Sequence, residues 1–89
     1  MLLALAGCAS ASPEYIGLEP RRMVIEGTEI RVWQRGDRAQ AIRMGWIARG
    51  EHGVAMARMV QAIEAVTGCD VRQDFIAGDS GVLNARLEC

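Results

Sequence analysis

The sequence predicts a small α+β domain of two layers, with one amphipathic helix packed on an antiparallel sheet of four or five strands. Three observations predict this class. The chain has 89 residues, which leaves room for one small core. Residues 51–67 repeat apolar side chains at the helical spacing, and the segments on both sides have the composition of strands separated by turns. The expected order is strand, strand, a possible third strand, helix, strand, strand.

Two strands are expected at residues 23–25 and 30–34, with a glycine-containing turn between them. A second turn leads to residues 39–44, which would form the third strand. Their high alanine content favours a strand only weakly, so the sequence leaves this element open.

The helix over residues 51–67 is predicted from its apolar stripe. Arg58, Gln61 and Glu64 fall outside the stripe, and Gly68 is suited to end the helix. His52, the one histidine of the chain, lies at the amino-terminal end of the stripe, where we interpret it as a partly buried side chain rather than a functional one. The stripe is formed by Met56, Met59, Val60, Ile63, Val66 and Thr67.

The last segment is expected to be a hairpin closed by a disulfide between Cys69 and Cys89. Facing residues of an antiparallel pair have a constant index sum, so this bridge centres the hairpin on Asp79. An alternative stays open, in which residues 82–87 form a short terminal helix. The hairpin register would place Val71 opposite Leu87, Gln73 opposite Ala85 and Phe75 opposite Leu83, all on the apolar face.

The amino terminus reads as a targeting segment rather than as part of the domain. Residues 1–7 form an uncharged apolar run that is too short to cross a bilayer but resembles the centre of a secretory signal. Leu5-Ala6-Gly7-Cys8 resembles the lipobox of bacterial lipoprotein precursors. We therefore divide the chain into a signal remnant (1–7), a lipidated cysteine with a flexible tether (8–20) and one domain (21–89).

The lipoprotein resemblance implies cleavage after Gly7 and attachment of a diacylglyceryl group and an amino-terminal acyl chain to Cys8. Several acyl chains together form a stable membrane anchor. Ala9 behind the cysteine resembles the pattern of lipoproteins sent to the outer membrane, facing the periplasm. Family precursors begin with basic residues, whereas no Arg or Lys precedes Glu14 here, so we expect that the start codon has been assigned too late.

Composition and motifs argue against several function classes. Ten basic and eleven acidic residues give a net charge of -1, which does not favour nucleic-acid binding. The sequence contains no nucleophile and base at a catalytic spacing, no phosphate-binding loop and no metal-ligand spacing. We therefore expect a protein that is not an enzyme and that needs no cofactor or metal.

The candidate partner-binding residues are two tryptophans and two arginines. Strand alternation sets Trp33 on the face opposite Ile30, between Arg31 and Arg35, and Trp46 follows the third strand. An exposed tryptophan between guanidinium groups is a suitable anchor for a partner. The alternative interpretation places Trp33 beneath the helix as a core residue.

Together these features predict a lipid-anchored, non-catalytic interaction module of the bacterial envelope. Its partner would be an envelope protein, a peptide or a wall component, bound at a sheet edge or at the Trp33 face. The alternative function is a periplasmic enzyme inhibitor or a carrier of a small ligand or peptide, in which the disulfide holds loops or a pocket rigid.

Overall fold

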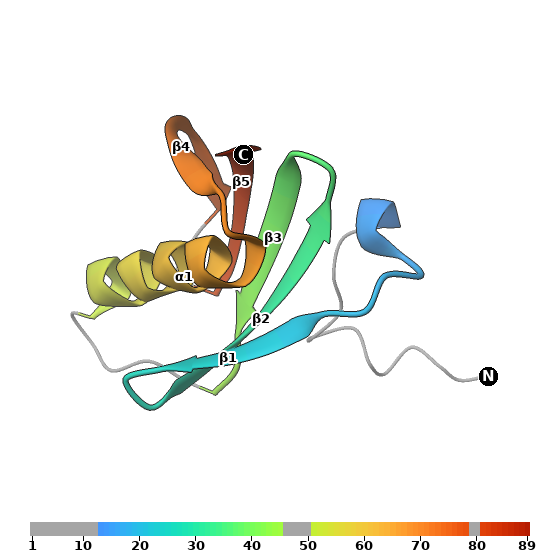
Figure 1. The fold of residues 1–89 in the computed structure, drawn as a ribbon. Helices are drawn as coiled ribbons and strands as arrows, with labels where there is room; N and C mark the ends of the chain where they lie inside the picture. The colour runs from blue at the N-terminus through green and yellow to red at the C-terminus, as the bar shows by residue number, and fades with distance from the viewer. Residues whose placement is uncertain (1–12, 46–50, 79–80) are drawn as a thin grey trace.

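A computed structural model describes residues 13–45, 51–78 and 81–89; for His52 and residues 73–75 it describes the backbone alone. The fold is α+β, with one helix on one face of a five-stranded antiparallel sheet of order β1-β2-β3-β5-β4 (Figure 1). The predicted class and element order are confirmed. The elements are η2 (Pro13–Tyr15), β1 (Arg21–Ile25), β2 (Thr28–Arg35), β3 (Arg38–Arg43), α1 (His52–Thr67), β4 (Asp70–Gly78) and β5 (Val82–Glu88).

Strand β3 forms despite its alanine content because it lies at the centre of the sheet. It pairs with β2 on one side and with β5 on the other, so both of its edges are hydrogen-bonded. Ala39 and Ala41 are fully buried on the face toward α1, and their small side chains let the helix lie close to the sheet. Tertiary pairing here outweighs a weak local preference for strand.

Helix α1 packs on the sheet through the predicted stripe. Met59 and Ile63 are fully buried, and Val54 is 47% exposed on the outer side, as the helical period indicates. Gly68 adopts φ 75°, and its N–H donates to the carbonyl of Glu64, which ends the helix in the left-handed conformation that glycine favours. The core between the layers consists of Ile30, Val32, Ala39, Ala41, Met59, Ala62, Ile63, Cys69, Val71, Leu83, Ala85 and Leu87.

The terminal segment is a strand rather than a helix, and the predicted disulfide is present. Cys69 and Cys89 are bonded, with 4.4 Å between their Cα atoms. Beside the bridge the predicted register is confirmed, because Val71 pairs with Leu87. On the outer face of the same end, Arg72 Nε lies 3.9 Å from Glu88 Oε2.

Further from the disulfide the predicted register is wrong. From Val71 to Ile76 β4 advances five residues while β5 advances two, from Leu87 to Ala85, so β4 contains three extra residues. An odd number of extra residues exchanges the two faces of a strand, because successive side chains point to opposite sides. Ile76, and not residue 73, therefore lies opposite Ala85, and Gly78, not residue 75, lies opposite Leu83.

Candidate functional site

The sheet face opposite α1 carries a second, smaller core. Trp33 of β2 and Ile42 of β3 are buried there together with Tyr15 of η2, which lies over this face (Figure 1). Tyr15 is 2% exposed and belongs to the stretch 8–20 that the sequence predicts as a tether. η2, within that stretch, is therefore in contact with the domain, because an aromatic side chain gains free energy by leaving water.

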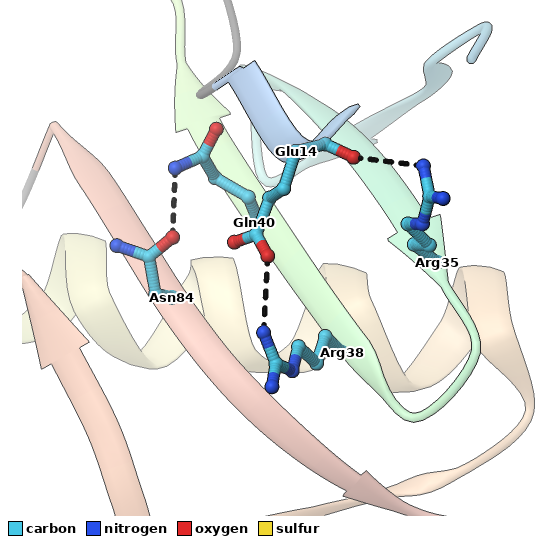
Figure 2. Close-up of polar contacts among 5 residues, drawn as sticks. All are labelled: Glu14, Arg35, Arg38, Gln40 and Asn84. Carbon is cyan, nitrogen blue, oxygen red and sulfur yellow. Dashed lines mark hydrogen bonds and ion pairs between the residues drawn. The ribbon is translucent and has the colours of Figure 1, made fainter. Parts of the chain in front are cut away.

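A row of polar side chains crosses the same face beside Trp33. The strand register places Trp33 opposite Gln40 of β3 and Gln40 opposite Asn84 of β5. Gln40 is 1% exposed, and its Nε2 donates to Oδ1 of Asn84 at 2.7 Å (Figure 2). A buried amide needs such a partner, so this bond holds both side chains in one orientation.

Three arginines form the next row. Arg35 and Arg38 face each other at the β2–β3 turn, and Arg38 faces Arg86 of β5. Like charges directly across a sheet destabilise the pairing, so this arrangement needs an acceptor or a negative charge nearby. The row gives one end of the sheet face a cluster of guanidinium donors.

Glu14 of η2 supplies both an acceptor and a negative charge. Arg38 Nη1 lies 3.1 Å from Glu14 Oε1 in an ion pair, and Arg35 Nη1 donates to the main-chain carbonyl of Glu14 at 3.2 Å (Figure 2). The Arg38 and Glu14 side chains are 52% and 43% exposed. Solvent at such an ion pair leaves it worth at most about 1 kcal/mol.

A pocket of about 400 Å³ lies beside this ion pair. Its wall includes Tyr15, Arg38, Asn84 and Arg86, and it continues onto Ile76 and Ala77 of the edge strand β4. A second hollow, with a wall of Pro13, Glu14, Arg35 and Arg38, adjoins it. Glu14 and Arg38 line both hollows.

The environment of the pocket changes the acidity of Tyr15. Burial raises the pKa of its phenol above the ordinary value, the charge of Glu14 raises it further, and Arg38 acts in the opposite direction. The phenol is therefore protonated at neutral pH. With Asn84 and the arginines it gives the pocket wall neutral and cationic donors, which suit an anionic group such as a carboxylate.

The predicted binding residues are only partly brought together. Arg31 and Arg35 flank Trp33 on the predicted face, but Trp33 is 7% exposed, so the expectation of an exposed anchor is wrong. The alternative placement beneath α1 is also wrong, because Tyr15 covers Trp33 on the other face. Arg31 Nε pairs with Glu29 Oε2 at 3.1 Å, outside the pocket.

Three of the sequence predictions concern parts that the structure does not describe. Trp46 and the lipobox with Cys8 lie outside the described residues, as does the side chain of His52. Their predicted roles stay predictions.

Sequence reasoning missed Glu14, Tyr15, Arg38 and Asn84 as site residues. One signal was present for Tyr15, since it is the one tyrosine of the chain and lies in a segment that was otherwise expected to be solvated. Arg38 could also have been paired with Arg35 from the two-residue turn between them. Asn84 had no such signal, because its partner Gln40 is distant in the sequence.

The fold and site define a class of protein: a two-layer α+β domain, stapled by a disulfide, with an arginine-lined pocket on the sheet face that α1 leaves uncovered. Comparison of the chain with protein-family models, with curated protein sequences and with solved structures found no match.

Among the described residues, no three His, Cys, Asp or Glu side chains group as a possible metal site. No helix in this part of the chain is long and apolar enough to cross a membrane.

Proposed function

We propose that this protein is a lipid-anchored, non-catalytic interaction module of the bacterial envelope, held at the outer membrane and facing the periplasm. The resemblance of Leu5-Ala6-Gly7-Cys8 to a lipobox supports the anchor. The Cys69–Cys89 disulfide supports an oxidising compartment, because cytoplasmic thiols are normally kept reduced.

The observation that carries the binding role is the arginine row beside a pocket of about 400 Å³. With Trp33 buried, we propose that a partner is met on this face by Arg35, Arg38 and the pocket wall. Guanidinium groups and an amide recognise anionic and polar groups of proteins, peptides or wall components. The proposed module therefore binds through the sheet face and not through a tryptophan anchor.

The anchor and this surface would be close together. Pro13 begins η2 only five residues after Cys8. Such a length of chain spans at most about 18 Å when fully extended. A module anchored at Cys8 would keep η2 and the arginine row close to the membrane surface, and its partners would be molecules that are present there.

The test of the anchor is the intact mass of the protein from membrane and soluble fractions of its host, measured with and without reduction and alkylation. We expect a chain that begins at Cys8 with added lipid mass, and two thiols that react only after reduction. Cys8→Ser is the matched control and should give an unlipidated chain. An unlipidated wild-type chain with reactive Cys69 and Cys89 in the same fractions would reject the envelope proposal.

A second candidate is a periplasmic carrier of a small ligand or peptide, and the pocket size favours it over an enzyme inhibitor. Ligand pockets commonly measure roughly 300–1,000 Å³, and the pocket beside Arg38 falls within that range. Native mass spectrometry of protein isolated from its host separates the candidates. A carrier would retain a ligand of defined mass, which Arg38→Gln should release, whereas an interaction module would be recovered as the bare chain or with a protein partner.

A further inference from the structure

We infer that the pocket beside Arg38 is a carboxylate-binding site for short peptides. In the absence of a ligand, the carboxylate of Glu14 is paired with the guanidinium of Arg38. This inference rests on the proposed function and deepens it by naming the chemistry of the ligand. It assigns η2 the role of an internal occupant that a peptide must displace.

The ion pair between Glu14 and Arg38 is the first observation. Glu14 Oε1 lies 3.1 Å from Arg38 Nη1, so the site holds a carboxylate at hydrogen-bond distance. The side chains are 43% and 52% exposed, so a competing carboxylate can reach Arg38 from solvent. Arg38 also lines both hollows, so a competing group has space next to it.

The wall next to Arg38 is already arranged for a polar ligand. Asn84 is held by its 2.7 Å bond from buried Gln40, so its amide does not need to be ordered when a ligand binds. Preorganised groups bind more tightly than mobile ones because less conformational entropy is lost. Tyr15, whose phenol is protonated for the reasons given above, lines the same wall.

The position of the pocket in the sheet favours a peptide over a simple anion. The wall continues onto Ile76 and Ala77 of β4, which is the last strand of the sheet. An edge strand offers main-chain donors and acceptors to an extended peptide, and the small side chain of Ala77, which pairs with Asn84, leaves room beside it. A peptide with one carboxylate at Arg38 and its backbone beside β4 would use both features.

The carboxylate could belong to a peptide carboxyl terminus or to an acidic side chain, and the experiment separates these sources. The probes are acetyl-Ala-Ala-Ala with a free carboxyl terminus, its carboxamide, and acetyl-Ala-Glu-Ala carboxamide. Each is titrated into the full chain carrying Cys8→Ser, and binding is followed by the amide shifts of β3, β4 and β5 in nitrogen-15 NMR spectra. We expect one or both carboxylate peptides to bind and the neutral carboxamide not to bind.

Two substitutions on this background test the displacement. Arg38→Gln removes the guanidinium and should weaken binding by about tenfold, the effect of losing one charge-assisted hydrogen bond. Glu14→Gln removes the internal competitor and should tighten binding by about two- to fivefold, the worth of an exposed ion pair. The opposite directions of the two effects distinguish displacement from a site in which Glu14 supports the ligand.

Matched controls lie on the same face outside the pocket. Arg22 and Glu29 form an ion pair of 3.7 Å. Arg22→Gln and Glu29→Gln change the net charge in the same two ways, and both should leave the affinity unchanged. If net charge alone changed the peptide affinity, these control variants would change it as much as the pocket variants do.

The inference is overturned if neither carboxylate peptide binds, if the carboxamide binds as tightly, or if Glu14→Gln leaves the affinity unchanged or lowers it. Wild-type affinity in Arg38→Gln would overturn it as well. These outcomes are independent of the lipidation experiment. An unlipidated chain that binds as expected rejects the anchor alone, and a lipidated chain that fails these titrations rejects the carboxylate site alone.

Discussion

Tyr15 joins the amino-terminal segment to the sheet and also forms part of the pocket wall. Its ring is buried with Trp33 and Ile42, and the preceding residue, Glu14, reaches Arg38. The aromatic contact therefore determines where the Glu14 carboxylate lies. The packing of Tyr15 on this face is thus linked to the pairing of Glu14 with Arg38.

The titration of Tyr15 provides a test of this packing. Because the pKa of its phenol is raised in the folded state, the folded protein holds this proton more tightly than the unfolded chain does. Its contribution to stability is complete below the unfolded pKa of about 10 and is lost as the pH rises through the folded value. Since the chain has one tyrosine, phenolate absorbance reports on Tyr15 alone.

We expect the native protein to titrate at higher pH than the chain in urea. Glu14→Gln should move the native value toward the ordinary one, because the Glu14 charge is the second cause of the shift. Coincident native and denatured titrations would contradict the buried position of Tyr15.

Single elements of this fold depend on contacts outside themselves. Strand β3 is stable because β2 and β5 pair with both of its edges, and β4 changes register between its two ends. After the change, β4 runs to Gly78, which has φ 121° and passes close to the main chain of Val82. The β4–β5 hairpin therefore requires a residue without a Cβ at position 78, next to the main chain of Val82.

Gly78→Ala should destabilise the protein by about 2 kcal/mol, because alanine is strained at this φ and its Cβ would collide with the Val82 carbonyl oxygen. Gly53→Ala is the matched control. Gly53 lies in α1 with no atom within 4 Å of an added Cβ, so alanine there should stabilise by about 0.5–1 kcal/mol. Urea unfolding of both variants measures the difference, and equal effects would reject the close approach at Gly78.

On the scale of the whole molecule, the sheet separates two environments. One face is covered by α1, whose Arg58 also donates to Glu26 at 3.1 Å beyond the end of β1. The other face carries η2, the arginine row and the pocket. The disulfide joins Cys69, directly before β4, to Cys89, directly after β5, and so fixes the ends of these two strands to each other.

The disulfide should contribute about 3 kcal/mol, since it closes a loop with a sequence separation of 20 and so restricts the unfolded chain. We expect the double substitution Cys69→Ser and Cys89→Ser to lower the free energy of unfolding by that amount in urea. This is a large share of the stability of so small a domain. Cys8→Ser should leave the unfolding curve unchanged, and an unaltered curve for the double variant would show that the bridge contributes nothing.

The sequence by itself determined the features that depend on neighbouring residues or on simple pairing. The period of residues 51–67 predicted α1, the end of α1 at Gly68 followed from residue type, and the even cysteine pair predicted the bridge. The register beside that bridge followed as well, because Cys69 and Cys89 constrain it directly. Features that depend on local geometry or on a covalent bond can be predicted without the rest of the fold.

Only the tertiary structure decided the site. The alternation of β2 placed Trp33 on the correct face, but its burial depends on Tyr15, which comes from a segment with no periodic pattern. The bulge in β4 and the Gln40–Asn84 bond depend on strands that meet only after folding. These features are set by packing and hydrogen bonding between distant segments, whose free energy exceeds the local preferences that a sequence displays.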